Sequence, residues 1–414
     1  MSTQTVTIDR LGALGHGIAH TSEGPVYVPH ALPGETVAIA RHGSQGTVIS
    51  TAKTSTDRVA PTCRHYDPDR DACGGCSLQH LAELPYRDFK RELVVAALAA
   101  KGLTPEVGPL VACGPGQRRR TVFSVRRTEK ELLLGFNRAE TNHIVSIEDC
   151  PVASPGIMDR LEQIRRVAAA LASAAGAFRL AVLETLTGLD LAADGLKPLG
   201  DKQRRGVVEA VLALRGIARV SANGEILVEP QKPVVDFGGV LVSPPPGAFM
   251  QATKEAEDAM AALVLAHTGK AKRVLDLFAG SGTFALRLAR TARVHAVEGE
   301  EKSLKALDQA ARNTQGLKPV SVEKRDLFRR PLTAQELKAF DAVVFDPPRA
   351  GAEAQVRELA RSGVKKVVAV SCNPLTLARD LRLLADGGYG IRTVVPVDQF
   401  LWSPHVEAVA LLER

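Results

Sequence analysis

Hydrophobic and polar positions follow a strand-like pattern at the start of the chain. Between residues 5 and 49, short β-forming pieces such as Val6-Thr7-Ile8 and Pro25-Val26-Tyr27-Val28 are separated by glycine and proline turns. Closely spaced short strands of this kind predict a small β-barrel. Residues 50–55 are polar and carry little charge, so we expect a linker there.

The pattern changes after residue 273, where apolar runs alternate with stretches of helical period. In residues 301–313, for example, Leu304, Leu307 and Ala311 share one helical face. This alternation predicts a doubly wound parallel sheet, and the last two runs, which are close in sequence, should form a hairpin that adds an antiparallel strand. The expected strands are residues 273–278, 293–299, 320–326, 340–346, 365–372, 391–397 and 406–412. Seven strands in this arrangement match the class I methyltransferase version of the Rossmann fold.

Length and composition fit a globular protein of several domains. A chain of 414 residues is too long for a single core. The proline-rich stretch at residues 243–247 interrupts regular structure before the C-terminal pattern begins. We therefore predict an α/β protein with a small β-barrel in residues 1–55, an α+β central domain in residues 56–245 and a Rossmann-like domain in residues 246–414.

Charge and hydropathy narrow the possible locations and partners. The formal net charge is +7 and the isoelectric point is about 9.1. This excess of positive charge is a mild indication that the protein binds polyanions, and only a local basic patch would make that indication specific. No apolar run is long enough to span a membrane, and the N-terminus lacks a charged-then-apolar leader. We expect a cytoplasmic protein without membrane contact.

One thiol and two carboxylates should meet at one edge of the C-terminal sheet. Cys372 ends the apolar run of residues 367–372, Asp346 ends the run of residues 340–346, and Glu407 stands in the run of residues 406–412. Open α/β sheets bind ligands at the carboxyl ends of their strands. A free thiol is more often a small buried hydrophobe. Together with the two acids, however, Cys372 predicts a nucleophile with a neighbouring proton acceptor.

The other cysteines suggest a metal centre. The chain has 6 cysteines, too few for a disulfide framework. Four thiolates fit either a zinc ion or an iron–sulfur cluster. A Cys-Gly-Gly-Cys pair, irregular spacing and a proline after the last cysteine favour the cluster, with zinc or unliganded cysteines as alternatives. We predict a [4Fe-4S] cluster bound by Cys63, Cys73, Cys76 and Cys150.

A run of arginines in the central region is a candidate nucleic-acid contact. Residues 118–127 read Arg-Arg-Arg-Thr-Val-Phe-Ser-Val-Arg-Arg, without an acid. A solvated strand face would explain the pattern simply. Arginine pairs with phosphates through a fixed fork and an interleaved aromatic ring can stack on a base, so we predict a polynucleotide contact. The predicted contact residues are Arg118, Arg119, Arg120, Phe123, Arg126 and Arg127.

The turn after the first C-terminal strand indicates the cofactor. Residues 276–283 read Asp-Leu-Phe-Ala-Gly-Ser-Gly-Thr, which lacks the third glycine of a dinucleotide-binding turn. Glu298 ends the second strand, where a carboxylate can hold the ribose hydroxyls of a nucleoside. Asp326 and Asp346 end the third and fourth strands. Acidic strand ends repel a pyrophosphate but suit the cationic sulfonium and amino group of S-adenosyl-L-methionine, which we predict as the cofactor.

These motifs together resemble the RNA uracil-5-methyltransferase family, in its iron–sulfur branch with a TRAM-like barrel (the RumA/RlmD type). The resemblance covers nearly the whole chain. It is most specific in Asp346-Pro347-Pro348-Arg349, Ser371-Cys372-Asn373-Pro374 and His405-Val406-Glu407. By this similarity, the methyl-donor site is lined by Gln251, Phe278, Thr283, Glu298, Asp326 and Asp346.

The resemblance also implies a reaction and a substrate. Cys372 attacks carbon 6 of uracil, carbon 5 then accepts the methyl group, and Glu407 removes the carbon 5 proton. The target base must leave its stack to reach the pocket. Arg349 is expected either to contact the nucleic acid or to pair with a carboxylate. The favoured substrate is 23S ribosomal RNA, with transfer RNA as the alternative, and we expect a monomer.

Other functions fit the motifs less well. Adenine amino-methyltransferases use an Asp-Pro-Pro-Tyr type of loop, whereas Arg349 takes the place of the aromatic residue here. RNA cytosine-5-methyltransferases also form cysteine adducts but usually carry Pro-Cys or Thr-Cys motifs. An iron–sulfur RNA-binding factor without transferase activity would not need Cys372 and Glu407. Transfer of a labelled methyl group to RNA distinguishes an enzyme from such a factor.

Overall fold

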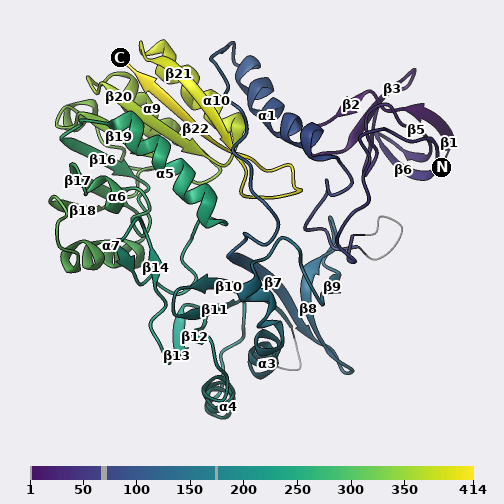
Figure 1. Cartoon of the computed structure of the whole chain (residues 1–414), viewed down its shortest axis with the longest axis horizontal. Helices are drawn as coiled ribbons and strands as arrows, with labels where there is room; N and C mark the ends of the chain where they lie inside the picture. Colours follow the sequence, from purple (N-terminus) through teal and green to yellow (C-terminus); the bar gives the residue numbers. More distant parts are fainter. Residues whose placement is uncertain (1, 67–71, 173–175) are drawn as a thin grey trace.

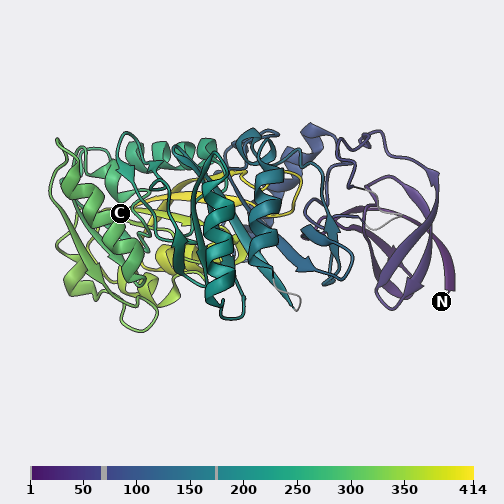
Figure 2. The ribbon, with the colours of Figure 1, turned by 90° about the horizontal axis from the view of Figure 1, so that it is seen from below.

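The computed structural model describes residues 2–66, 72–172 and 176–414. An N-terminal barrel, a central sheet and a C-terminal α/β domain follow one another along the chain (Figure 1). Seen from below, the barrel and the α/β domain lie at opposite ends of an elongated molecule (Figure 2). Within the described ranges, no helix is both long and apolar enough to cross a membrane.

The N-terminal strands form a six-stranded sheet in the order β1-β5-β6-β4-β3-β2, which folds around a small apolar core that includes Val26, Val28 and Ile39. The predicted linker is wrong over residues 50–53, because β6 continues to Lys53 and pairs with β5. This end of β6 is exposed and its residues are polar, which is why the sequence pattern predicted a linker there. The strands are β1 (Ser2–Thr7), β2 (Arg10–Leu11), β3 (Gly17–Thr21), β4 (Gly24–Val28), β5 (Thr36–His42) and β6 (Gln45–Lys53).

The central domain is a seven-stranded sheet in the order β13-β12-β11-β10-β7-β8-β9. Side chains alternate between the two faces of a strand. In β7, Phe123 and Val125 pack into an apolar core with helix α3, while Arg120 and Arg126 lie on the opposite, open face. The elements are β7 (Arg120–Arg127), β8 (Leu132–Asn137), β9 (Ile144–Ser146), α2 (Pro155–Met158), α3 (Leu161–Leu171), β10 (Ala177–Thr185), β11 (Gly188–Asp194), α4 (Asp201–Leu212), β12 (Ile217–Ala222) and β13 (Glu225–Val228).

The C-terminal domain is a second seven-stranded sheet, in the order β18-β17-β16-β19-β20-β22-β21. Neighbouring strands from β18 to β20 are parallel, while β22 runs antiparallel to both β20 and β21, as the sequence pattern predicted. The strands are β16 (Arg273–Leu277), β17 (Arg293–Glu298), β18 (Val320–Lys324), β19 (Ala342–Phe345), β20 (Lys366–Ser371), β21 (Gly390–Val397) and β22 (Glu407–Glu413). Two short strands, β14 (Val235–Asp236) and β15 (Leu241–Val242), precede this sheet.

Helices cover both faces of this sheet. Alternate residues of β19 belong to different apolar clusters: Ala342 and Val344 pack on the side of α5–α7, whereas Val343 and Phe345 pack on the side of α8–α10. The helices are α5 (Lys254–Thr268), α6 (Ala285–Leu288), α7 (Glu301–Asn313), α8 (Ala334–Leu337), α9 (Glu353–Ala360) and α10 (Pro374–Asp386).

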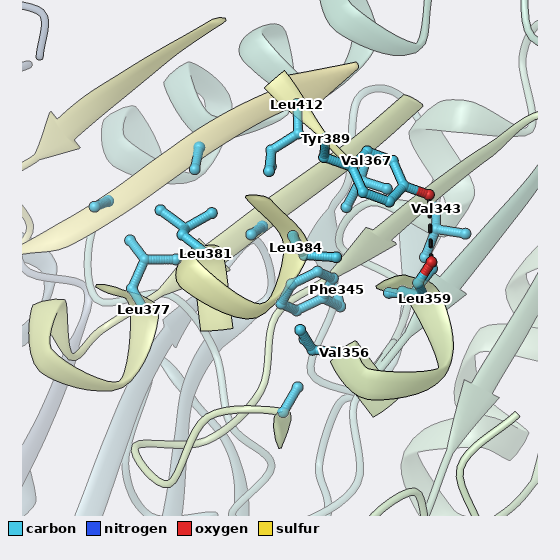
Figure 3. Close-up of a cluster of buried hydrophobic side chains, with 14 of the residues drawn as sticks. Val343, Phe345, Val356, Leu359, Val367, Leu377, Leu381, Leu384, Tyr389 and Leu412 are labelled. Carbon is cyan, nitrogen blue, oxygen red and sulfur yellow. Dashed lines mark hydrogen bonds between the residues drawn. The ribbon is translucent and has the colours of Figure 1, made fainter. Parts of the chain in front are cut away.

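The core under α9 and α10 fixes the loops that enter these helices. Figure 3 shows side chains of β19 and β20 packed against side chains of both helices, with the Tyr389 hydroxyl directed at the Leu359 carbonyl. Each fully buried side chain of this size contributes about 1.5–3 kcal/mol. The loops before α9 and α10, which carry Asp346 and Cys372, therefore start from rigid supports.

Helix α1 (Glu83–Ala99) extends the C-terminal domain with a segment from much earlier in the chain. Its residues Val94, Ala97 and Leu98 belong to the same apolar cluster as β19 and α10. Figure 1 shows α1 beside α10. The predicted boundaries assigned residues 83–99 to the central domain, whereas the helix packs on the C-terminal sheet.

Candidate active site

Two loops at the carboxyl edge of the C-terminal sheet are tied together. Cys372 follows β20 directly, and Asn373 then caps α10 by accepting a hydrogen bond from the Leu375 N–H at 3.1 Å, with Pro374 at the first helical position. The Asn373 side-chain amide also donates to the Arg349 carbonyl at 3.1 Å. The loop that carries Cys372 is thus bonded to the loop that carries Asp346 and Arg349.

Glu407 reaches the same edge from the opposite direction. It is the first residue of β22, which runs antiparallel to β20 so that Ala408 pairs with Ser371. This register brings Glu407 beside Cys372. Glu407 is 2% exposed, and Cys372 is half-buried. The structure therefore brings together the thiol and the two acids that the sequence placed at one sheet edge.

Burial dominates the electrostatics of this edge. It raises the pKa of Cys372 to about 11, to which the nearby charges of Glu407 and Asp346 add, while Arg349 acts in the opposite direction. Burial likewise raises the pKa values of Glu407 and Asp346. Before ligands bind, the site therefore holds a protonated thiol and two acids that disfavour further negative charge.

The glycine turn after β16 has the backbone conformations of a ligand-binding loop. Gly280 and Gly282 have φ of 54° and 103°, and Phe278 has φ of 59°, which is unusual for a bulky residue and typical of functional sites. The Gly280 N–H donates to Glu298 at 2.9 Å, which fixes this carboxylate beside the turn. Asp326 accepts hydrogen bonds from the N–H groups of the short turn that follows it, and the ring of Phe328 in that turn lies 5.5 Å from the Phe278 ring.

The acids at this edge fit a cationic cofactor. Among the described residues, neither carboxyl oxygen of Asp276 has a hydrogen-bond partner, although the side chain is completely buried. Its pKa lies well above the ordinary value because of burial and the neighbouring charges of Asp346 and Glu298. A bound group with a positive charge would relieve this crowding of acids. Thr283 lies at the end of the turn, where its carbonyl accepts a hydrogen bond from Arg287 at 2.6 Å.

A pair of glutamines joins the catalytic and cofactor sides of the site. The amide of Gln399 donates to Glu407 at 2.8 Å and to Gln251 at 2.7 Å, and the amide of Gln251 donates to Asp346 at 3.1 Å. Gln251 was a predicted cofactor residue, whereas no motif in the sequence pointed to Gln399. Its role becomes visible only when the turn between β21 and β22 is folded.

The arginine-rich strand separates into residues that face solvent and residues that support the fold. Phe123 is 0% exposed and packs in the central core, so the predicted stacking of its ring on a base is wrong. Arg119 pairs with the buried carboxylate of Glu257, and Arg127 donates to the Ala169 carbonyl of α3 at 2.9 Å, so both are engaged within the protein.

The open face of the central sheet keeps the other arginines. Arg120 and Arg126 lie there, and Arg179 of β10, which the sequence analysis missed, is exposed opposite Ser124 of β7. The guanidinium of Arg118 lies 5.5 Å from the centre of the Phe400 ring. Arg349 is exposed, and in the described ranges it forms no ion pair with a carboxylate.

The four predicted cluster ligands line one cavity. Cys63, Cys73, Cys76 and Cys150 surround a cavity of about 370 Å³, together with Arg118. Burial raises the pKa of Cys73 to about 11 and that of Cys76 to about 12. In the part of the chain that the structure describes, no group of three or more His, Cys, Asp or Glu side chains is arranged to hold a metal ion. Four thiols at one cavity are the donor set that either a zinc ion or an iron–sulfur cluster takes.

Comparisons with protein families and sequences agree with this architecture. A family model described as tRNA (Uracil-5-)-methyltransferase matches residues 241–414, and a TRAM-domain model matches residues 1–40. An "Uncharacterized RNA methyltransferase" of Agrobacterium fabrum is 68% identical and covers 100% of both chains. The 23S rRNA (uracil(1939)-C(5))-methyltransferase RlmD of Halomonas elongata is 33% identical over 99% of this chain and 89% of its own length.

A solved structure shares the whole fold. The crystal structure of Pyrococcus abyssi tRNA (uracil-54, C5)-methyltransferase, in complex with S-adenosyl-L-homocysteine, superposes with a TM-score of 0.78. The match covers 99% of both chains at 24% sequence identity. Barrel, central sheet and C-terminal domain therefore occur in the same arrangement in both proteins.

Proposed function

The chain belongs to the RNA uracil-5-methyltransferase family, and from this premise we propose that it uses S-adenosyl-L-methionine to form 5-methyluridine in 23S ribosomal RNA. The observation that carries the proposal is the meeting of Cys372, Asp346 and Glu407 beside an acidic cofactor site. The printed activity of the Halomonas elongata relative favours ribosomal RNA. Transfer RNA is the second candidate, because the tRNA enzyme of Pyrococcus abyssi shares the fold over the full chain.

The first chemical task belongs to Cys372. Carbon 5 of uracil is a weak nucleophile, and attack of the Cys372 thiolate on carbon 6 forms an S–C6 bond and moves the electron pair of the C5–C6 double bond to carbon 5 and its neighbouring carbonyl. The thiol must first lose its proton to solvent, which burial and the acids around it disfavour. Arg349 is positioned to assist, since its positive charge lowers the pKa of this thiol.

Glu407 completes the reaction. After carbon 5 has accepted the methyl group, it still carries its original proton. Glu407 takes that proton, the C5–C6 double bond forms again, and the S–C6 bond breaks to release Cys372 as a thiolate. A buried carboxylate with a raised pKa suits this step, because its affinity for a proton is higher than that of an exposed acid.

The cofactor side of the site is built from strand ends. S-adenosyl-L-methionine supplies the methyl group and a positive charge when it is bound. Glu298 would hold the ribose hydroxyls, and Phe278 would flank the adenine ring together with Phe328. Asp346 and Gln251 would face the reacting end, with Asp326 and Thr283 completing the pocket.

The RNA would bind along the open face of the central sheet. We assign the phosphate contacts to exposed or partly exposed arginines, because each can pair with a phosphate without breaking an internal ion pair. These residues are Arg118, Arg120, Arg126, Arg179 and Arg349. The cavity lined by the four cysteines would hold a [4Fe-4S] cluster next to this surface, as a structural support outside the reaction path.

The proposal is tested by labelled methyl transfer. Purified protein is incubated with radiolabelled methyl donor and with ribosomal or transfer RNA from a strain that lacks the gene, and the modified nucleotide is mapped. We expect 5-methyluridine in 23S ribosomal RNA. Labelling of transfer RNA alone would select the second candidate, and transfer to neither RNA would refute the proposed activity.

Two variants separate the catalytic roles. Cys372→Ala should neither methylate RNA nor become attached to it. Glu407→Gln should form the methylated adduct but release it about 10²–10⁴ times more slowly, which is the usual contribution of a general base. It should therefore accumulate as a denaturant-resistant protein–RNA conjugate. Cys113→Ala is the matched control and should behave like the wild type. A conjugate joined through Cys113 would contradict the assignment.

A further inference from the structure

The side chain of Gln399 is held by three hydrogen bonds that leave it one orientation. Its amide nitrogen donates to Glu407 at 2.8 Å and to Gln251 at 2.7 Å, while its oxygen accepts from the Ala252 N–H at 2.6 Å. A flipped amide would place oxygen against two acceptor oxygens and nitrogen against an N–H donor. The side chain is buried, so none of these losses could be compensated by water.

The backbone around Gln399 is anchored from the opposite side. Asp398, the preceding residue, accepts hydrogen bonds from Lys90 at 2.7 Å and from the Tyr86 hydroxyl at 2.6 Å. Both partners come from α1, which packs on the C-terminal sheet. Asp398 thus faces α1 while Gln399 faces the active site. The orientation of Gln399 is therefore fixed through the backbone as well as through its own amide.

The hydrogen bond from Gln399 engages only one oxygen of Glu407. It reaches Oε1, and within the described ranges no hydrogen bond is made to Oε2. A general base needs one oxygen in line with the proton that it removes, and a carboxylate held at the other oxygen cannot rotate away. The same amide is bonded to Gln251, which contacts Asp346. The base and the cofactor side of the site are thereby joined through two amides.

We propose that Gln399 is a positioning residue for the methyltransferase reaction: its amide fixes the orientation of the Glu407 carboxyl toward the carbon 5 proton and favours the ionised form of that carboxyl. The inference rests on the proposed function, in which Glu407 is the base. It adds a residue that touches neither the uracil nor the cofactor but acts through Glu407 and Gln251.

The charged groups around Glu407 determine in which direction the loss of Gln399 shifts the pKa of Glu407. Burial and, after it, Asp346 at the end of β19 raise the pKa of Glu407, while the hydrogen bond from Gln399 and the ammonium of Lys90 from α1 lower it. The thiol of Cys372, at the end of β20, interacts with Glu407 and is itself influenced by Arg349. Loss of the Gln399 donor therefore moves the pKa of Glu407 further up. The base then needs a higher pH to ionise.

The test is the pH dependence of adduct release in Gln399→Met, which keeps the length of the side chain and removes both donors. Single-turnover methylation and the amount of Cys372–RNA conjugate are measured between pH 6 and pH 10. A hydrogen bond to a charged group is worth about one to two pKa units. We expect the release profile to move to higher pH by about that amount, with conjugate accumulating at neutral pH.

Two further measurements keep the outcome decisive. Binding of the methyl donor, measured by calorimetry, should stay within a few-fold of the wild type, because Gln251 remains. Gln399→Glu keeps the shape of the side chain and replaces its donor nitrogen by oxygen, so it should also shift the pH profile of adduct release to higher pH. This variant provides the test if Gln399→Met does not fold.

The possible results separate the two levels of inference. An unchanged release profile, or a rate lowered equally at every pH without conjugate, would overturn the role of Gln399. A wild-type protein that neither methylates RNA nor forms a conjugate would instead overturn the proposed function. The control variant is Gln335→Met in α8, a glutamine that lies away from the site and should leave the profile unchanged.

Discussion

Lys90 gives the sharpest test of how the turn before Glu407 is held. Its ammonium group is 0% exposed and donates to Asp398 at 2.7 Å, to the Phe400 carbonyl at 3.0 Å and to the His405 carbonyl at 2.6 Å. All three acceptors lie in the turn between β21 and β22. The substitution Lys90→Met keeps most of the side-chain length but leaves Asp398 buried without its cation and two carbonyls without a donor.

The expected cost follows from the burial of the pair. Removing one partner of a buried ion pair costs about 3–5 kcal/mol, because the remaining charge stays in a poorly solvating interior. Asp398 keeps hydrogen bonds from the Tyr86 hydroxyl and the Phe400 N–H, at 2.6 Å and 2.8 Å, so we expect the lower end of that range. The double variant Lys90→Met/Asp398→Asn removes the stranded charge. It should lose less stability than the sum of the two single variants, by about 1–3 kcal/mol.

Trp402 makes the assay specific to this turn. It is the single tryptophan of the chain, and its backbone N–H donates to the Tyr86 hydroxyl at 2.9 Å. Urea titrations followed by Trp402 fluorescence should show a lower midpoint for Lys90→Met than for the wild type. Lys101→Met, at an exposed position just beyond α1, is the matched control. If Lys90→Met lost less than about 1 kcal/mol, as the control should, or if the effects in the double variant were simply additive, the buried pair would not be what holds the turn.

Three further predictions concern charge and metal content. Burial raises the pKa of Glu407 above its unfolded value, so the contribution of this carboxyl to stability should be complete at low pH and fall as the pH rises through neutrality. Urea titrations should therefore find Glu407→Gln equal to the wild type near pH 4 and more stable by at least about 1 kcal/mol near pH 9. The paired substitutions Arg126→Gln and Arg179→Gln should reduce the salt dependence of RNA binding by roughly one unit of slope per lost phosphate contact. The affinity for the methyl donor should not change. An unchanged slope would mean that these arginines are ordinary surface residues. Anaerobically purified protein should contain four iron atoms per chain, as expected for one [4Fe-4S] cluster. Cys150→Ala should lose this iron, whereas Cys113→Ala should keep it. Stoichiometric zinc without iron would refute the cluster.

The C-terminal domain was predictable because its strands are parallel and buried on both faces. Such strands read as continuous apolar runs, and the residue that follows each run falls at a common edge of the sheet. That rule alone brought Glu298 and Asp346 to one side of the fold and Cys372 beside them. The antiparallel return of β22 then placed Glu407 at the same edge.

In β7, the sequence pattern alone did not identify which arginines are free to contact RNA. Alternation along β7 separates Arg120 and Arg126 from Phe123, but the sequence does not say which face is covered by α3. Arg119 lies just before the strand, and its partner Glu257 is far away in sequence, in α5. Ion pairs between distant segments leave no periodic signal, so an arginine that supports the fold looks the same as one that binds RNA.

Helix α1 did carry a signal that could have been recognised. Tyr86, Lys90 and Val94 are spaced by four residues and therefore share a helical face. A lysine within an otherwise apolar stripe requires a buried acceptor, and the three carbonyl and carboxylate oxygens around Lys90 meet that need. The sequence could not identify those acceptors, because they lie in a turn more than 300 residues later.

The turn between β21 and β22 is where the separate parts of the chain act on the catalytic base. The N–H groups of Ser77 and Leu78, directly after Cys76, both donate to the Trp402 carbonyl, at 2.9 Å and 3.0 Å. Trp402 has φ of 57°, a conformation that a bulky residue keeps only when its surroundings enforce it. The segment that carries the cysteines therefore holds the same turn that α1 anchors through Asp398. A centre bound by these cysteines would stabilise the position of Glu407 through backbone hydrogen bonds, without entering the reaction itself.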